Sequence, residues 1–226
     1  MKRILLSLII VAVAAQSCVT SLQPLATYKT AVTDDRLSGT WKSDDVDYTV
    51  QKFYNSDLFK KLKKEMDKNK TDTSKTLTKK ETEDSILYAR SYVVNYTKDN
   101  IEYHMFGTMV KLNGQYFINF TAADINTNEQ NEQAFEITLT DRLATYTIAR
   151  VKFNNANSLQ LDFIDGSFLY EQVKAGRMKI KNERDDLYDT FLITASTNEL
   201  QQFIEKYGTD GRFFNKENSV TLIRKG

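Results

Sequence analysis

This 226-residue sequence contains few of the residues that most often act as nucleophiles, general bases or metal ligands. There is one histidine, His104, and one cysteine, Cys18. A nucleophilic triad needs a base beside its nucleophile, and a zinc site normally takes several His or Cys ligands, so these two residues provide neither. The thirty Asp and Glu residues could supply an acid–base pair of the glycosidase kind, but the sequence does not show which of them face each other. We therefore predict a protein that is not an enzyme, with no catalytic residue, no metal and no cofactor.

The cysteine directly follows a segment with the features of a secretory leader. Lys2 and Arg3 form a basic start, and residues 4–15 form an almost unbroken apolar run. This run is shorter than the ~20 apolar residues that a membrane span needs, so residues 1–17 are predicted to be a signal peptide. An unpaired thiol is a liability in an oxidising exported compartment, which favours a modified Cys18.

The residues that lead into the cysteine, Ala15-Gln16-Ser17-Cys18, resemble the bacterial lipobox. The resemblance implies that the Cys18 thiol is diacylated and that the chain is anchored to a membrane by its lipid. On this hypothesis residues 18–36 are the lipidated N-terminus and a tether. No acidic run follows Cys18, so we expect an envelope location in the outer membrane, facing the periplasm. The alternative is ordinary cleavage near Ala14 or Ala15, which would leave Cys18 as a free thiol.

The charge balance argues against nucleic acid as a partner. The full chain has 31 basic and 30 acidic side chains, and the leader carries two of the basic ones and no acid. The exported part therefore has 29 basic and 30 acidic side chains. A nearly neutral protein has no bulk attraction to a polyanion.

One stretch departs from this balance. Residues 52–80 contain ten lysines and four acids, and Leu58, Phe59, Leu62 and Met66 recur at helical spacing. We predict a helical, basic insertion at residues 55–83 that ends in a polar loop. It is either a solvated helix face with a soluble loop, or a surface that docks on phosphate-rich lipid or polysaccharide.

The rest of the chain has the period-two alternation of β-strands with one buried face. Asn113-Gly114 is a strong two-residue hairpin signal, and a helix is predicted at residues 197–207 before a last strand. Short strands joined by hairpins favour an antiparallel arrangement, and barrel closure removes exposed edges. The predicted fold is all-β with minor α: one domain at residues 37–226, an antiparallel barrel of about eight strands with a helical insertion and a late C-terminal helix. The predicted strands are residues 47–54, 85–96, 101–112, 115–120, 135–139, 144–153, 158–164, 187–195 and 219–224.

The Gly39-x-Trp41 motif before the first barrel strand is similar to the one that marks the lipocalin or calycin superfamily. In that family the tryptophan closes one end of the barrel beneath a basic residue from a late strand, which Arg224 would supply here. The late helix followed by a final strand, residues 197–224, also resembles the family. The resemblance implies a cup-shaped barrel that binds a small apolar ligand.

Two functional hypotheses follow. In the first, aromatic side chains at alternating strand positions line a cavity for a small apolar or amphipathic ligand. In the second, side chains fill the barrel, and a non-catalytic structural or accessory lipoprotein uses the insertion to meet an envelope protein partner. The candidate lining residues are Tyr88, Tyr92, Tyr103, Phe117 and Tyr146.

Overall fold

The computed structural model describes residues 19–44, 46–68, 78–98, 101–123, 125–127, 135–137, 144–185 and 190–225. Call 3₁₀-helices η. In chain order the elements are β1 (Thr20–Ser21), β2 (Ala31–Val32), η1 (Asp35–Leu37), β3 (Gly39–Ser43), β4 (Val46–Lys52), η2 (Phe53–Asn55), α2 (Asp57–Lys68), α3 (Lys79–Ala89), β5 (Ser91–Lys98), β6 (Ile101–Leu112), β7 (Gln115–Ala122), β8 (Ile125–Thr127), β9 (Phe135–Ile137), β10 (Tyr146–Asn155), β11 (Ser158–Ile164), α4 (Gly166–Lys174), β12 (Asn182–Asp185), β13 (Thr190–Ile193), α5 (Thr197–Tyr207) and β14 (Phe214–Arg224).

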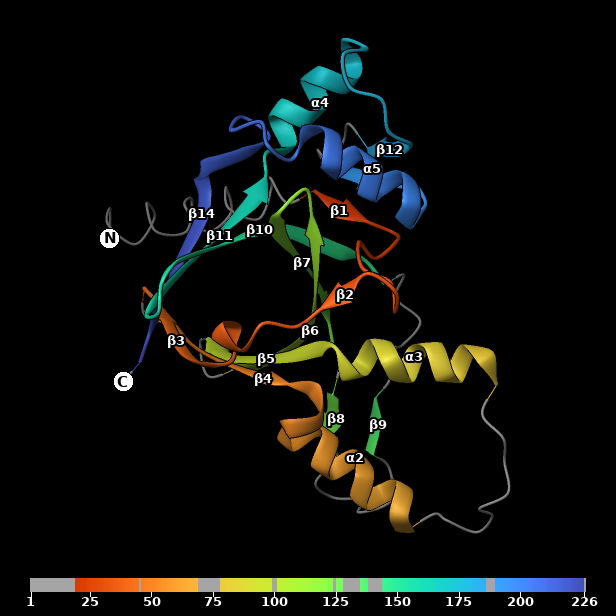
Figure 1. Cartoon of the computed structure of the whole chain (residues 1–226), viewed down its shortest axis with the longest axis vertical. Coiled ribbons are helices and arrows are strands. Elements are labelled where there is room, and N and C mark those ends of the chain that lie inside the picture. Colours follow the sequence, from red (N-terminus) through yellow and green to blue (C-terminus); the bar gives the residue numbers. More distant parts are fainter. Residues whose placement is uncertain are drawn as a thin grey trace, which may run out of the picture.

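Eight of the strands form a closed antiparallel barrel (Figure 1). Its order is β3-β4-β5-β6-β7-β10-β11-β14, and β14 returns to β3 through the pairs Ile223–Lys42 and Arg224–Trp41. The Asn113-Gly114 turn joins β6 to β7, with positive φ at both residues as such a hairpin turn requires. The predicted fold class, an antiparallel barrel with a helical insertion and a late helix, is confirmed.

Strand pairing determines which side chains point into the barrel, because Cα partners in adjacent strands lie on the same face of a sheet. Trp41 and Val50 face inward from the first hairpin, and Ile118 faces inward from β7. The buried interior is apolar and includes Leu37, Trp41, Val50, Tyr92, Val94, Met109, Ile118, Ala149, Val151, Leu159, Leu161 and Leu222.

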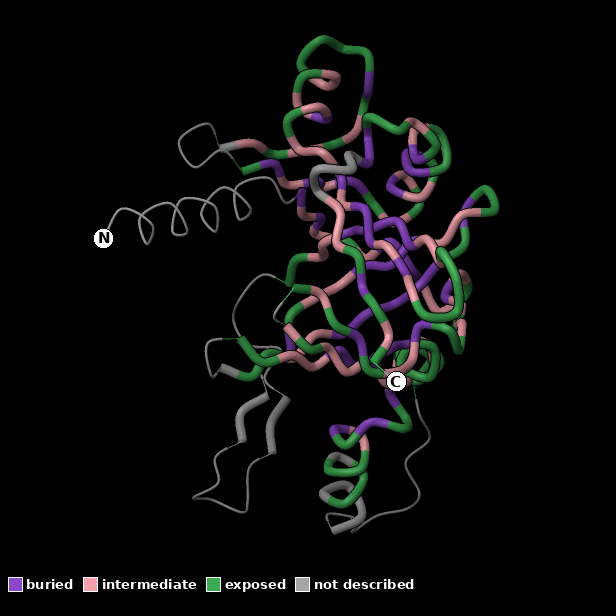
Figure 2. Tube along the Cα trace, turned by 90° about the vertical axis from the view of Figure 1, so that its left-hand side faces the viewer, coloured by how far each residue is buried: buried purple, intermediate pink, exposed green. Residues whose placement is uncertain are grey.

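A second core lies on the outside of the same wall. The apolar face of α5, formed by Leu200, Phe203 and Ile204, packs with Phe117 and Ile148 from β7 and β10. Figure 2 shows buried residues along the barrel strands and on the inner side of the helix that covers them. Part of the barrel wall is therefore buried on both faces.

The tether predicted for residues 18–36 is wrong for the part that the structure describes, residues 19–36. Val19 is only 4% exposed, and β1 pairs with both β10 and β13. Leu25 and Ala26 belong to the core under α5. These apolar side chains are buried against the barrel wall, so the folded domain begins no later than Val19.

In its described part the insertion contains two helices, α2 and α3. Residues 71–77 of the predicted loop lie outside the described residues. The end of the predicted polar loop, up to Glu83, and the start of the strand predicted from Ser85 are α3 instead, and β5 begins only at Ser91. The cause is a capping box at the start of α3, in which the side chains of Thr78 and Glu81 accept hydrogen bonds from each other's backbone N–H. The apolar run in this part of the sequence was too short to distinguish a strand from a helix.

Candidate functional site

One end of the barrel is closed by Trp41 and Arg224. The Trp41 indole N–H donates to the Leu37 carbonyl (2.9 Å), and the Arg224 guanidinium lies 4.2 Å from the centre of the Trp41 ring. Arg224 also donates to the carbonyls of Ser38 (2.9 Å) and Arg36 (2.7 Å). One side chain thus joins the last strand to the segment that enters the first strand.

Gly39 makes room for this arrangement. Its φ is +142°, a conformation that glycine adopts at little cost. A Cβ atom at this position would lie 2.2 Å from Nη1 of Arg224. The glycine of the Gly-x-Trp motif is therefore explained by the space that the arginine takes.

Tyr92 closes the same end from β5. Its hydroxyl accepts a hydrogen bond from the Asp34 N–H (2.7 Å) and donates one to the Asp34 carbonyl (3.0 Å). Burial raises the pKa of Tyr92 to about 12, so the hydroxyl stays protonated at neutral pH. Tyr92 points inward, as expected of a lining residue, but it is fully buried and bonded at the closed end.

The opposite end is lined by aromatic rings that solvent reaches. Trp41, Tyr48, Tyr96 and Tyr103 form one row of paired residues across β3, β4, β5 and β6. Strands in a barrel are tilted relative to the barrel axis, so a row of paired residues that crosses several strands runs obliquely from one end of the barrel toward the other. Exposure rises along it from 1% at Trp41 to 39% at Tyr103.

These tyrosines contact one another. The ring centroids of Tyr48 and Tyr96 are 5.4 Å apart, and those of Tyr96 and Tyr103 are 4.9 Å apart with the planes only 11° from parallel. Burial raises the pKa values of Tyr48 and Tyr96. Six large apolar or aromatic side chains face inward at this end without being fully buried, and we call them the mouth: Tyr48, Tyr96, Tyr103, Met105, Phe120 and Phe163.

The predicted lining residues separate into two groups. Tyr92 and Tyr103 point into the barrel, and only Tyr103 belongs to the mouth. Phe117 points outward and is buried under α5, and Tyr146 also lies on the outward face of its strand. Tyr88 is on α3, outside the barrel, with its ring 5.3 Å from that of Phe53.

The other residues singled out from the sequence have structural surroundings or lie outside the described chain. His104 is on the outer wall, where its Nδ1 lies 2.9 Å from Oδ1 of Asn95. Cys18 lies outside the described residues. Sequence analysis missed Tyr48 and Tyr96, although each stands two residues from an inward-facing valine in its own strand, Val50 and Val94.

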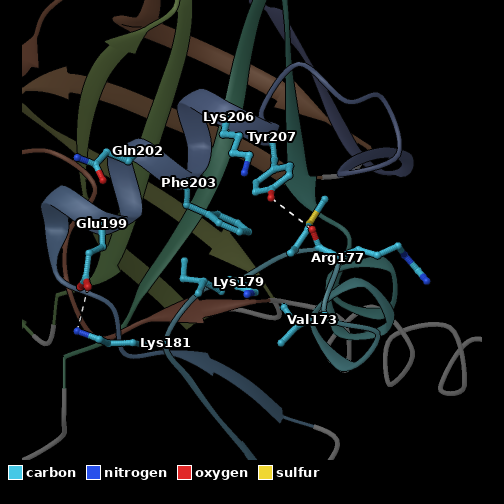
Figure 3. Close-up of a pocket in the computed structure, with 12 residues that line it drawn as sticks. Val173, Arg177, Lys179, Lys181, Glu199, Gln202, Phe203, Lys206 and Tyr207 are labelled. Carbon is cyan, nitrogen blue, oxygen red and sulfur yellow. Dashed lines mark hydrogen bonds and ion pairs between the residues drawn. The ribbon is translucent and has the colours of Figure 1, made fainter.

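A separate groove lies between α5 and the segment that follows α4 (Figure 3). Its volume is about 940 Å³, within the range of small-molecule sites, and we call it the basic groove. One ion pair crosses it, between Lys181 and Glu199 (2.9 Å). Hydrogen bonds from Lys181 and Ser196 lower the pKa of Glu199 to about 2. The groove is lined by Val173, Gly176, Arg177, Met178, Lys179, Ile180, Lys181, Glu199, Gln202, Phe203, Lys206 and Tyr207.

Within the described ranges, no three His, Cys, Asp or Glu side chains come together in a way that could hold a metal ion. None of the helices described has the length and apolar character required to cross a bilayer. The chain matches no known protein family, no curated protein and no solved structure.

Proposed function

We propose that this protein is a non-catalytic, lipid-anchored binding protein of the cell envelope that holds a small apolar or amphipathic molecule at the mouth of its lipocalin-like barrel. The observation that supports the proposal is the row of tyrosines whose rings contact one another and become more exposed toward the mouth. Tyrosine offers a flat apolar face and a polar hydroxyl, which suits a ligand with both characters.

The contrast between the two ends supports this location. At the closed end Trp41 and Tyr92 are buried and their polar atoms are hydrogen-bonded within the protein. At the mouth the inward-facing rings are not fully covered by the described residues. Inward-facing aromatic surface that stays in contact with water is a source of binding free energy of ~25 cal/mol per Å² when a ligand covers it.

Native mass spectrometry of the protein without residues 1–17, with Cys18→Ser, tests the proposal. We expect a discrete added mass, and the same molecule in an organic extract of the preparation. Tyr103→Ser should reduce the bound fraction. Tyr88→Ser is the matched control, because Tyr88 is also 39% exposed but lies outside the barrel. Equal ligand loss in both variants, or a bare protein mass in every host and extract tried, would contradict binding at the mouth.

The anchor has its own test. Cys18→Ala should move the full-length protein from the membrane fraction to the soluble fraction, because the acyl chains supply the attachment. A Cys18→Ala protein that stays with membranes after a high-salt wash would exclude lipid anchoring at this residue.

A second function, contact with an envelope protein partner through the insertion, is favoured by one observation. Three of the large apolar side chains that remain exposed in the described chain, Tyr54, Ile86 and Tyr88, lie on η2 and α3. Exposed apolar side chains that gather in one place mark interaction surfaces. Ile86→Ser should lower co-purification of a partner from envelope extracts while Tyr103→Ser leaves it unchanged, and the reverse result would assign the partner to the mouth.

A further inference from the structure

The basic groove has an excess of positive charge over an apolar floor. Four cationic side chains line it against one carboxylate, and that carboxylate, Glu199, is already paired with Lys181. Lys179 and Lys206 are both exposed, and neither forms an ion pair with another described residue. The Arg177 guanidinium donates to the neutral side chain of Gln172 (2.7 Å) and to no other side chain in the described part of the chain.

Both walls of the groove, α5 and the segment that follows α4, are anchored in the core of the protein. Phe203 of α5 and Met178 of the opposite wall are both buried in the core under the helix. The Tyr207 hydroxyl donates to the Arg177 carbonyl (3.4 Å), which ties the end of α5 to the other wall. The cations therefore project from backbone that is anchored in the core. Figure 3 shows Lys206 on α5 and Lys179 on the opposite wall.

The groove is close to the point where the described chain begins. Val19 directly precedes β1, which pairs with β13, and the N–H of Thr194 just after β13 donates to the carbonyl of Lys181 in the groove wall (2.9 Å). The Thr197 hydroxyl and the Gln201 amide, both on α5, donate to the carbonyls of Pro24 (2.8 Å) and Leu25 (2.7 Å). No flexible spacer separates Cys18 from this region, because Val19 is itself buried in the fold.

We propose that the basic groove binds the anionic headgroups of the membrane to which the chain is attached; the proposal rests on the lipid anchor at Cys18 suggested above. A diacylated cysteine next to a buried Val19 keeps this end of the domain at the bilayer surface. Lysines near such a surface are attracted by anionic lipids, and a phosphate group suits the Lys179 and Lys206 ammonium groups, which project from opposite walls of the groove.

The other lysine-rich region is at the opposite end of the molecule. Figure 1 places β1, α4 and α5 together at the top and α2 and α3 at the bottom, and Figure 2 shows the same separation from the side. Lys63 and Lys64 on α2 are exposed like the groove lysines, but on this orientation they point away from the anchoring membrane. They therefore provide a control with the same change in charge.

The test is vesicle co-sedimentation of the unacylated protein, without residues 1–17 and with Cys18→Ser, so that the groove is the only attachment under examination. The vesicles contain phosphatidylglycerol in phosphatidylcholine, or phosphatidylcholine alone. The proteins compared are the parent, the Lys179→Gln/Lys206→Gln variant and the Lys63→Gln/Lys64→Gln variant. Unchanged Trp41 fluorescence shows that each variant is folded.

We expect the parent to bind the anionic vesicles and not the neutral ones. The groove variant should bind about 25-fold more weakly, from about fivefold for each lysine, while the α2 variant stays within about twofold of the parent. No binding by the parent, an unchanged groove variant, or equal weakening of both variants would overturn the proposal. Because the protein carries no acyl chain, none of these outcomes bears on acylation of Cys18 or on a ligand in the mouth.

Discussion

Asp162 on the outer barrel wall is the residue whose change should have the largest predictable effect on stability. Its side chain is 0% exposed and accepts hydrogen bonds from Arg150 (2.8 Å), Gln160 (2.5 Å) and Ser219 (2.7 Å), with Lys152 Nζ also at 2.7 Å. Burial alone raises the pKa of Asp162, but these donors together lower it from 3.8 to about 2. The carboxylate is thus charged in the folded protein at neutral pH.

Asp162→Asn removes this charge and turns an amide N–H₂ toward groups that are themselves donors. Lys152 is 40% exposed and can turn to solvent, but the Arg150 side chain is only 8% exposed. Arg150 would keep the Gly208 carbonyl (3.1 Å) and the Phe214 ring (4.8 Å) as partners. Leaving a buried charge without its counter-ion costs about 3–5 kcal/mol. Because Lys152 can be resolvated, we expect a loss of about 3 kcal/mol, which lowers Tm by about 6–12 °C in a domain of this size.

Urea unfolding followed by fluorescence gives the measurement, since Trp41 is the only tryptophan and is buried in the fold. Arg150→Met/Asp162→Leu is the control, because replacing both charged partners by apolar groups of similar size is often close to neutral. A loss below about 1 kcal/mol for Asp162→Asn would refute the argument, because it would equal the value of a surface ion pair. A double variant as unstable as the single one would also count against it.

Three further outcomes are expected. Folding lowers the pKa of Asp162, so its carboxylate adds about 2 kcal/mol to the free energy of unfolding above pH 4, and this stabilisation is lost as the pH falls toward 2. The urea midpoint of the parent should therefore fall over this pH range by more than that of Asp162→Asn. Gly39→Ala should cost about 2 kcal/mol or more in urea unfolding, because the new Cβ displaces Arg224 and is strained at positive φ; an unchanged midpoint would show that the arginine moves freely. Tyr92→Phe should lower stability by about 1–2 kcal/mol in the same assay, because Asp34 keeps a backbone N–H and carbonyl without their hydroxyl partner; no change would mean that water replaces it.

Local signals in the sequence determined much of the architecture. The Asn113-Gly114 turn sets the β6–β7 register by itself, since the two-residue hairpin allows few alternatives. The alternation in each strand and the late helix were sufficient to predict the barrel. The partnership of Trp41 with Arg224 was also expected from a motif, and the structure places the two in contact.

The candidate site was less accessible to sequence analysis because two parts of the fold depend on distant contacts. Residues 19–36 have no strong strand or helix pattern, yet Leu25 and Ala26 are buried by α5 and the barrel wall. The apolar run before β5 could have been strand or helix, and the capping box of Thr78 with Glu81 decided for helix. Tyr88 was consequently assigned to the barrel interior when it lies outside.

The phase of the strands is the property that only tertiary structure could decide. Neighbouring residues Phe117 and Ile118 are both almost fully buried, Phe117 under α5 and Ile118 inside the barrel. When both faces of a strand are covered, hydrophobicity no longer shows which face points inward. The sequence by itself therefore determined that a barrel forms and where its hairpins turn. Pairing across β3 to β6, together with strand tilt, determined that Tyr48, Tyr96 and Tyr103 rise toward the mouth, because that row joins residues far apart in the chain.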